Sequence, residues 1–458
     1  MKFEQQQQQD EEETSLMEKL SHLSSEGSLS EDEENRKLYS SILSADGLTK
    51  SSTFQAFFTL CKSFIGSGVL TLAFSFKNAG AGIAIILTIF IGILTYHCTM
   101  LILDVGDAKS GKKERVSYSR IAFDELKKFG MYSVEVSIVV MQIGVCIGIF
   151  ILANKFFEHT FCIYEVSELC GNRVFTVLLC ALLTIPLCFV NNMHYFYIPS
   201  LAGFAFLIIA LLTQLFYCFK SWDLELSAGP GLWEALTTVN LEKIPLLFGV
   251  AIYAFEGIGP IFDIRDSMQK PKEFSGIMKI NIFFLLIAYT IFPLVCVLTI
   301  SKIPEIVLFS LPKDNTFYLL VQVGYVFSGL LGFPTQFYPA IQILENSKHL
   351  KNNIFDDKGN TKNPFLRYGL RVFIVCVLLI IANITKSFNL FLNFLGSCVF
   401  TYVGYLLPIW IYNAFFKDTI KPPTKYLNWI CFAFGLFFGV SGMIISFIEL
   451  IKYKEHTI

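Results

Sequence analysis

Apolar runs of about 18 residues or more recur along this sequence, and each is long enough to cross a bilayer core of about 30 Å. Of the 458 residues, 54% are hydrophobic and only 16% are charged, whereas a soluble globular domain carries roughly 25% charge. The pattern predicts an all-α integral membrane protein. The apolar windows predict eleven transmembrane helices, at about residues 54–77, 79–104, 132–157, 174–191, 196–219, 244–264, 277–300, 315–344, 366–384, 388–416 and 426–451.

The segments that flank these spans have a different composition. Residues 1–53 contain a Gln run, an acidic run and many Ser residues, which is typical of disordered segments. We therefore expect a disordered acidic tail at 1–53, a transmembrane domain at 54–451 and a short tail at 452–458. Within the first tail, residues Tyr39 to Ile42 have a Tyr-x-x-apolar form that trafficking adaptors can recognise, although such tetrapeptides also occur by chance.

Basic residues between the predicted spans indicate the orientation, because Lys and Arg accumulate on the cytoplasmic side. With the N-terminus inside, four of the five inside loops are basic, and the outside loops contain at most two basic residues each. Only the short loop between the fourth and fifth spans departs from this pattern. The bias predicts a cytoplasmic N-terminus and a C-terminal tail on the opposite side.

The sequence contains 12 Cys, and most of them lie inside apolar spans, where Cys behaves as a small hydrophobic residue. No metal-ligand spacing is present, so we expect no metal site. Cys162 and Cys170 differ, because both fall in one polar loop on the predicted outer side. They are a candidate disulfide if that loop faces an oxidising compartment.

Two predicted spans contain closely spaced glycines near their centres. The first span contains Phe64-Ile-Gly-Ser-Gly68 and the sixth contains Phe255-Glu-Gly-Ile-Gly259, so the pattern Phe-x-Gly-x-Gly recurs five spans later. Each Gly costs a helix interior about 1 kcal/mol relative to Ala, and unwound backbone in a membrane must be satisfied by protein or a cavity. Glycines that only allow close helix packing are the alternative. The matched positions favour a transporter built from two repeats.

A broken helix exposes N–H groups on one side of the break and carbonyl groups on the other, and an amino acid zwitterion needs both. We expect the first break to bind the carboxylate and the second to offer carbonyls to the ammonium group. The Ser67 hydroxyl and the side chains of Tyr253 and Phe255 would complete the pocket. The predicted substrate-binding residues are Ile65, Gly66, Ser67, Gly68, Val69, Tyr253, Ala254, Phe255 and Gly257.

Two charged residues lie beside these breaks. Glu256 is inside the second one, and because a charge at the bilayer centre costs about 2.5–3.5 kcal/mol, it should face the protein interior. It could brace the two breaks by accepting hydrogen bonds from the first, or it could carry a proton; the sequence leaves both roles open. Lys62, one turn before Gly66, either extends its ammonium group to an interface or places it where a sodium-driven relative would bind sodium.

The stretches SFIGSGVLTLAFSFKNAG (63–80), FGVAIYAFEGIGPIF (248–262) and SMQKPKEF (267–274) resemble the amino acid/auxin permease family. The resemblance extends over about residues 52–450. It implies the inverted-repeat fold of the bacterial leucine transporter, with spans 1–5 and 6–10 as the repeats and with spans 1 and 6 broken.

Within that family, the chain looks most similar to proton-coupled and vacuolar amino acid transporters. They resemble it in having Lys at the position of Lys62, where sodium-coupled members tend to have Asn. Two positions depart from the family pattern. Many members have Leu-Pro at Leu72-Ala73, and the animal proton-coupled members have His at Thr59. Another group must therefore carry the proton here, or the coupling differs.

The leading hypothesis is a secondary active transporter of small neutral amino acids, with proton-coupled symport and no cofactor. Its expected partners are the amino acid, protons, the lipid bilayer and trafficking adaptors, without nucleic acid, in a vacuolar, lysosomal or plasma membrane. Sodium coupling is one alternative. A receptor that senses amino acids and signals through its N-terminal tail is another. An enzyme is not expected, because no nucleophile–base motif, metal cluster or phosphate loop is present.

Overall fold

The computed structural model describes residues 51–110, 117–163, 172–190, 197–221, 231–312, 315–347, 350–355 and 361–455. The predicted tail up to residue 50, the adaptor motif within it and Cys170 lie outside these ranges. Within them the structure is almost entirely helical, and the β structure consists of two isolated bridges. The predicted all-α class is therefore confirmed.

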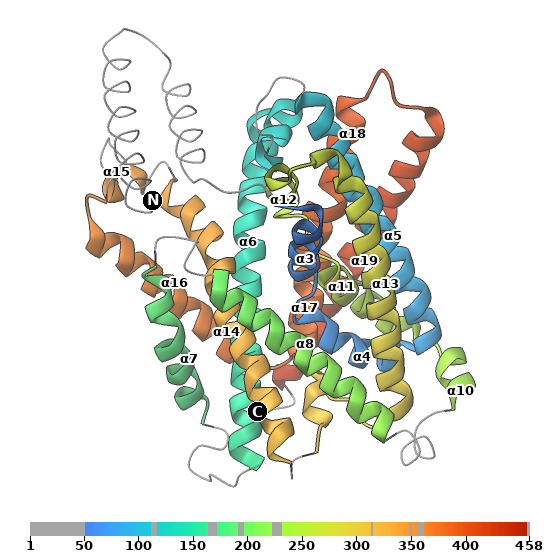
Figure 1. Ribbon diagram of the computed structural model, residues 1–458, viewed down its shortest axis with the longest axis vertical. Coiled ribbons are helices and arrows are strands. Elements are labelled where there is room, and N and C mark those ends of the chain that lie inside the picture. The colour runs from blue at the N-terminus through green and yellow to red at the C-terminus, as the bar shows by residue number, and fades with distance from the viewer. Residues whose placement is uncertain are drawn as a thin grey trace, which may run out of the picture. The chain divides into compact units, whose positions relative to one another are not determined.

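Most of the helices form one bundle (Figure 1). Its main helices are α5 (Ala81–Ser110), α6 (Tyr118–Ile163), α7 (Arg173–Cys188), α8 (Tyr197–Lys220), α13 (Phe274–Thr299), α14 (Thr316–Glu345), α16 (Pro364–Ile384) and α19 (Pro422–Glu455). Two spans are each divided into two helices, α3 (Thr53–Phe64) with α4 (Gly68–Ala79), and α11 (Ile244–Ala254) with α12 (Ile261–Ser267). A further span consists of α17 (Phe388–Leu395), two π-helical segments (Gly396–Phe400 and Tyr402–Leu406) and α18 (Leu407–Phe415).

Short helices connect these spans. They are α10 (Leu232–Thr237), α15 (Lys351–Ile354) and the 3-10 turns η2 (Leu241–Lys243), η3 (Pro271–Glu273) and η4 (Val307–Ser310). We call the end of the bundle where α3 begins the α3 end, and the opposite end, which includes α10 and η4, the α10 end. In Figure 1 the α3 end is at the top and α10 lies near the bottom.

The number of spans agrees with the prediction only in part. Eight of the described helices are long and apolar enough to cross a membrane, or nine spans when the bent pair α3–α4 is added. The two remaining predicted spans correspond to α7, which has 16 residues, and to α11 with α12, which have 11 and 7 residues. The count of eleven is therefore not confirmed, although each predicted span coincides with helix.

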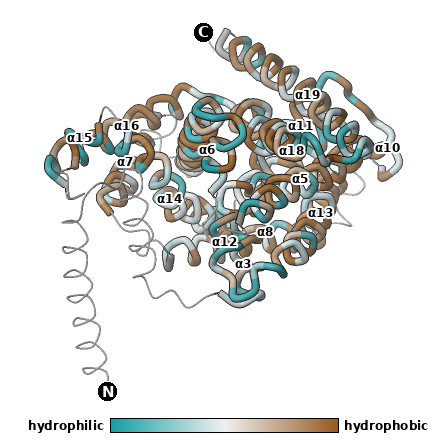
Figure 2. Tube along the Cα trace, turned by 90° about the horizontal axis from the view of Figure 1, so that it is seen from above, coloured by the Kyte–Doolittle hydropathy of each residue, from teal (hydrophilic) through white to brown (hydrophobic). Residues whose placement is uncertain are grey.

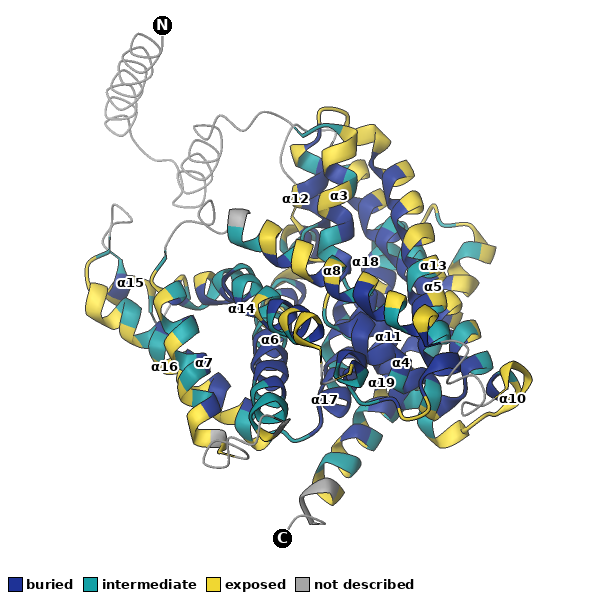
Figure 3. Ribbon diagram, turned by 60° about the horizontal axis from the view of Figure 1, so that its bottom comes forward, coloured by how far each residue is buried: buried dark blue, intermediate teal, exposed yellow. Residues whose placement is uncertain are grey.

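The outer surface of the bundle is apolar, as a lipid-facing surface requires. Exposed hydrophobic side chains occur on several long helices, for example Ile86 on α5, Phe373 on α16 and Phe437 on α19. Hydrophobic residues run along the long helices, whereas hydrophilic residues gather at α12 and α15 (Figure 2). Buried residues are concentrated around α11 and α4 in the middle of the bundle (Figure 3).

Helix α11 is the centre of the fold. Every residue from Leu246 to Ala254 is buried, and the helix packs against α4, α17 and α19. Close contact with the neighbouring π-helical segment depends on two glycines, because an added Cβ on Gly396 would overlap the carbonyl group of Gly249. The break that ends α11 is therefore held inside the protein.

Helix α6 begins earlier than the sequence suggested. The apolar window predicted a span from about 132, but the helix starts at Tyr118 and changes direction at Lys127, which has φ 58°. Positive φ is uncommon for a side chain other than Gly or Asn, and hydropathy does not report it. The segment before this kink is tied to α5 by ion pairs from Lys109 to Asp124 at 3.2 Å and to Glu125 at 2.9 Å.

A buried ion cluster joins three helices of the bundle. Arg371 on α16 bonds Glu345 on α14 at 2.7 Å, and both side chains are nearly inaccessible, at 1% and 2% exposure. Arg367 reaches the second carboxylate oxygen of Glu345 at 3.0 Å. Arg371 also donates to the carbonyl oxygen of Cys188 at the end of α7, at 2.8 Å. These basic residues, which helped to predict the orientation, therefore also fasten α7, α14 and α16 together.

Candidate functional site

The first predicted break is present. Helix α3 ends at Phe64, Ile65 is extended with φ −81° and ψ 103°, and α4 starts again at Gly68 with its axis turned by 51°. An added Cβ on Gly66 would meet no atom within 4 Å. The backbone of the break is therefore open to its surroundings, and the first turn of α4 has N–H groups that no preceding turn can bond.

The second break is longer, because residues 255–260 separate α11 from α12. The two breaks lie against each other. An added Cβ on Gly257 would overlap the ring of Phe64, and one on Gly68 would come within 3.0 Å of the Ala254 Cα. Tyr289 on α13 donates to the Phe64 carbonyl oxygen at 2.9 Å, so one carbonyl freed by the first break is satisfied by protein.

Both breaks line one cavity of about 550 Å³. Its other walls come from α6, α8 and α14, and it extends toward the α3 end, as shown by the lining residues Thr59, Asp263 and Pro339. The predicted site residues that line it are Lys62, Ile65, Gly66, Ser67, Tyr253, Glu256 and Gly257. The remaining ones, Gly68, Val69, Ala254 and Phe255, are buried behind it.

The orientation of Phe255 differs from the expectation that its side chain would shape the pocket. The ring is completely buried, and it packs edge-on against Tyr289 with ring centroids 5.0 Å apart. Tyr253 does reach the cavity. Its hydroxyl lies 3.4 Å from the Ser67 hydroxyl, and its ring lies 5.2 Å from that of Phe400 in the first π-helical segment. The Ser67–Tyr253 contact joins the two breaks by side chains.

Glu256 lies at the surface of the cavity and bonds within its own break. Its carboxylate accepts a hydrogen bond from the Ile258 N–H at 3.2 Å. The ion pairs found among the described residues include none between Lys62 and Glu256. In this conformation Glu256 therefore stabilises the second break locally, and a brace between the two breaks stays a prediction.

Charge is unevenly distributed around the cavity. Of the residues that line it, the charged ones are Lys62 on α3, Glu256 in the second break and Asp263 on α12. The lining residues from α6, α8 and α14 are apolar or neutral and polar, among them Ile149, Leu207 and Ser328. Among the described lining residues, one wall of the cavity thus carries charge, and the wall formed by α6, α8 and α14 carries none.

Sequence reasoning missed several residues of this cavity. They are Gln142 on α6, Asp263 on α12, Tyr325, Ser328 and Gln336 on α14, and Phe400 in the π-helical segment. The span prediction covered them without indicating which face of each helix points inward. Gly329 and Gly332 on α14 both line the cavity, and this closely spaced pair could have indicated which face of α14 points inward.

Polar contacts around Glu305, which lies between α13 and α14, close the α10 end of the bundle. Its carboxylate accepts from the Ser387 hydroxyl at 2.6 Å and from the Phe388 N–H at 3.0 Å, at the start of α17. Lys155 on α6 pairs with it at 3.0 Å, and the Thr71 hydroxyl on α4 donates to its backbone carbonyl at 2.7 Å. We call Glu305, Lys155, Thr71, Ser387 and Phe388 the α10-end seal.

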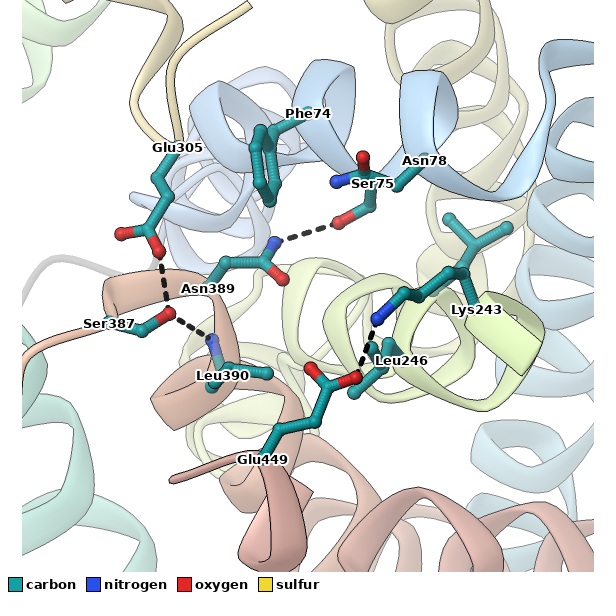
Figure 4. Close-up of a pocket in the computed structure, with 11 residues that line it drawn as sticks. Phe74, Ser75, Asn78, Lys243, Leu246, Glu305, Ser387, Asn389, Leu390 and Glu449 are labelled. Carbon is teal, nitrogen blue, oxygen red and sulfur yellow. Dashed lines mark hydrogen bonds and ion pairs between the residues drawn. The ribbon is translucent and has the colours of Figure 1, made fainter. Parts of the chain in front are cut away.

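A smaller cavity of about 240 Å³ borders this seal. Figure 4 shows Asn389 reaching Ser75 on α4, and Lys243 reaching Glu449 on α19. The Asn389–Ser75 bond is 2.8 Å long. Because these contacts join α4, η2, α17 and α19, the half-helices of both broken spans are fastened at this end.

Of the two residues of the candidate disulfide, Cys162 and Cys170, the structure describes only the first. Cys162 is disulfide-bonded, but Cys170 lies outside the described residues, so the pairing of these two residues stays a prediction. Among the described His, Cys, Asp and Glu side chains, no group of three or more is arranged to hold a metal ion.

Two broken spans that line a common cavity, closed at one end, are typical of secondary transporters built from two repeats. The fold is similar to that of a solved structure titled "Inward facing conformation of Mhp1", with a TM-score of 0.57, covering 89% of this chain and 92% of that one at 11% sequence identity. This likeness supports the leucine-transporter-like inverted-repeat fold with broken helices 1 and 6.

The sequence profile of the family described as "Transmembrane amino acid transporter protein" matches residues 49–451. The chain belongs to this family, which is the amino acid/auxin permease family. The resemblance noted from the motifs is thereby confirmed.

Relatives are found in fungi and plants. The chain is 27% identical over 430 residues to "Vacuolar amino acid transporter 4" of Saccharomyces cerevisiae, covering 88% of this chain and 58% of that protein. It is 21% identical over 426 residues to "Amino acid transporter AVT3B" of Arabidopsis thaliana, covering 92% and 99%. The chain thus spans little more than half the length of the yeast protein but nearly all of the plant one.

Proposed function

We propose that this protein is a secondary active transporter that moves small neutral amino acids across a membrane by proton-coupled symport. Family membership and relatives named as amino acid transporters support the substrate class. The observation that carries the proposal is that the two breaks line one cavity.

The breaks provide complementary partners for a zwitterion. Helix α4 starts directly after Gly66 and Ser67, which line the cavity, and its first turn has unbonded N–H groups and the positive end of the helix dipole, which suits a carboxylate. The last turn of a helix has carbonyls that lack a following turn to bond them, and at the end of α11 Tyr253 and Glu256 line the cavity, which suits an ammonium group. The substrate's backbone thus has partners along one wall.

The opposite wall favours a neutral side chain. The walls contributed by α6, α8 and α14 place no charged residue on the cavity, within the described chain. A charged side chain directed at this wall would lose its hydration without gaining an ion pair, and such desolvation is costly. Small or moderately sized uncharged amino acids fit this environment best.

Proton coupling is favoured over sodium coupling by the position of Lys62. It lies on the cavity beside the first break, without an ion-pair partner among the described side chains. A fixed ammonium group there opposes binding of a metal cation by like-charge repulsion. Glu256 and Asp263, the two carboxylates on the cavity, are the candidate proton carriers.

The orientation follows from the basic loops. The predicted loops after the second and eighth spans are the richest in Lys and Arg, and the helices that lead into them, α5 and α14, both end at the α3 end. We assign this end to the cytoplasm, so the cavity would be reached from the cytoplasm in this conformation. The yeast relatives named vacuolar favour an organelle membrane, and the Tyr39–Ile42 motif would serve sorting.

Uptake into proteoliposomes tests the proposal, with a panel of radiolabelled amino acids and with proton and sodium gradients set independently. The expected result is accumulation of neutral amino acids that follows the proton gradient and is unaffected by sodium. Accumulation that requires sodium would replace proton coupling by the sodium alternative. Saturable binding without flux for every amino acid would indicate a receptor and refute transport.

A further inference from the structure

Tyr325 on α14 is a buried polar residue that the two breaks do not explain. Its side chain lines the cavity and is only 4% exposed. Its hydroxyl group has no hydrogen-bond partner among the described residues. Buried hydroxyl groups in native proteins are normally hydrogen-bonded, because leaving one unsatisfied costs free energy. A cavity-lining hydroxyl of this kind is placed to bond a ligand.

The neighbours of Tyr325 locate it at the level of the breaks. Helix α14 contacts α6 one turn further along, where an added Cβ on Gly329 would lie 3.4 Å from Ile149. The preceding residue of α6, Gly148, lies beside the Tyr253 hydroxyl, at 3.9 Å from an added Cβ. Tyr253 is also near enough to Tyr325 for the two phenol groups to interact electrostatically. Tyr325 therefore lines the cavity at the level where Ser67 and Tyr253 meet.

Helix α4 begins in this region. Ser67 is the N-cap residue of α4 but makes no capping bond with its side chain. The N-terminus of this 12-residue helix, the Ser67 and Tyr253 hydroxyls and the Tyr325 hydroxyl all provide hydrogen-bond donors. The acceptor groups of the site, the α11 carbonyls and Glu256, belong to the other break. Hydroxyl groups can donate or accept, but the N-terminus of α4 can only donate, so the ligand group that fits these residues best is an anion.

We propose that Tyr325 is a further substrate-binding residue, whose hydroxyl donates a hydrogen bond to the carboxylate of an amino acid held at the start of α4. This inference rests on the proposed transport function. It assigns to α14 a part in recognising the substrate's backbone, in addition to forming the wall against its side chain. Tyr325 would thereby help to select amino acids over amines and amides of the same size.

The test compares Tyr325→Phe with Tyr318→Phe. Both tyrosines are on α14 and are buried, at 4% and 7% exposure, but Tyr318 does not line the cavity and instead packs against Tyr217. Half-saturation for radiolabelled L-alanine is measured by exchange in proteoliposomes, with unlabelled L-alaninamide as a competitor that lacks the carboxylate. Melting temperature in detergent reports on folding.

Tyr325→Phe should raise the half-saturating concentration of alanine about tenfold, equivalent to about 1.4 kcal/mol, with an unchanged melting temperature. Inhibition by alaninamide should stay within twofold of wild type, and Tyr318→Phe should change neither value. Unchanged alanine affinity in Tyr325→Phe would overturn the inference, as would an equal loss for alanine and alaninamide. If the wild-type protein exchanges no amino acid, the proposed function itself fails, which is a separate outcome.

Discussion

Gly66 and Gly257 occupy corresponding places in the two breaks but have different surroundings. Gly66 faces open space, whereas Gly257 is pressed against the ring of Phe64. The first glycine is thus needed for access to the backbone, and the second for contact between the breaks. Adding a single methyl group at each glycine can therefore distinguish a role in binding from a role in packing.

We predict that Gly66→Ala folds normally but binds substrate more weakly, because its methyl group enters the cavity. Gly257→Ala should lower stability by about 1–3 kcal/mol, as overpacking does. Melting in detergent and half-saturation in proteoliposomes measure the two effects. Adding Phe64→Leu, which shortens the obstructing side chain, should recover part of the stability of Gly257→Ala but not alter Gly66→Ala. Equal losses of stability in both single variants would contradict this assignment.

Glu256→Gln separates the two roles left open for that carboxylate. In the wild-type protein the Ile258 N–H donates to the Glu256 carboxylate at 3.2 Å. Glutamine retains an oxygen that can accept this hydrogen bond, but it cannot carry a proton. We therefore expect net proton-driven uptake to fall at least tenfold, while exchange, which needs no net proton movement, persists. Loss of both activities would assign Glu256 to structure. Full proton-driven uptake in the variant would show that the proton is carried elsewhere, with Asp263 the next candidate.

At the scale of the helices, the span containing Arg371 is held by an ion cluster in which Glu345 pairs with both Arg367 and Arg371. Arg371→Met would leave Glu345, at 2% exposure, with only Arg367 as a charged partner. Because Glu345 keeps this partner, the expected cost is that of a lost hydrogen bond to a charged group, about 1.5–3 kcal/mol, and the melting temperature in detergent should be clearly lower. The matched control is Arg120→Met, since Arg120 and Asp124 are 50% and 36% exposed and such pairs contribute about 0–1 kcal/mol. Similar melting temperatures for the two variants would refute the role of the cluster.

Some features of the helices could be predicted from the sequence, and others could not. The breaks were predictable because closely spaced glycines weaken a helix locally, wherever it packs. The inward direction of Phe255 was not, because an unwound segment has no helical period to assign its side chains. The positive φ at Lys127 and the π-helical segments that place Phe400 depend on tertiary packing. Tyr325 lay within a correctly predicted span, but only the packing of α14 against α6 and α8 shows that it lines the cavity.

At the scale of the whole molecule, the assignment of the α3 end to the cytoplasm can be tested by tags. Tags placed at the N-terminus and in the 346–363 loop should both be accessible from the cytoplasm, and a tag at the C-terminus should not. The basis is the excess of Lys and Arg in the loops at the α3 end. Protease protection in sealed vesicles reads out the side of each tag. A C-terminal tag on the same side as the N-terminal one would refute the odd number of spans.

The α10-end seal makes the two sides of the membrane inequivalent for a substrate. When one end of a carrier is closed in the most populated state, its site is accessible from that side for only a fraction of the time. The apparent dissociation constant for substrate on that side is then the intrinsic dissociation constant divided by this fraction. If the state open at the α10 end is populated at about 1–10%, substrate offered from that side should need a roughly 10- to 100-fold higher concentration for half-saturation. Lys155→Met removes one ion pair of the seal, worth about 0.2–1 kcal/mol when partly exposed, and should therefore reduce this difference in half-saturating concentration by a factor of about 1.4 to 5. Uptake measured separately in vesicles of each orientation would reveal the asymmetry, and equal half-saturation from both sides would show that the seal does not hold the carrier in one state.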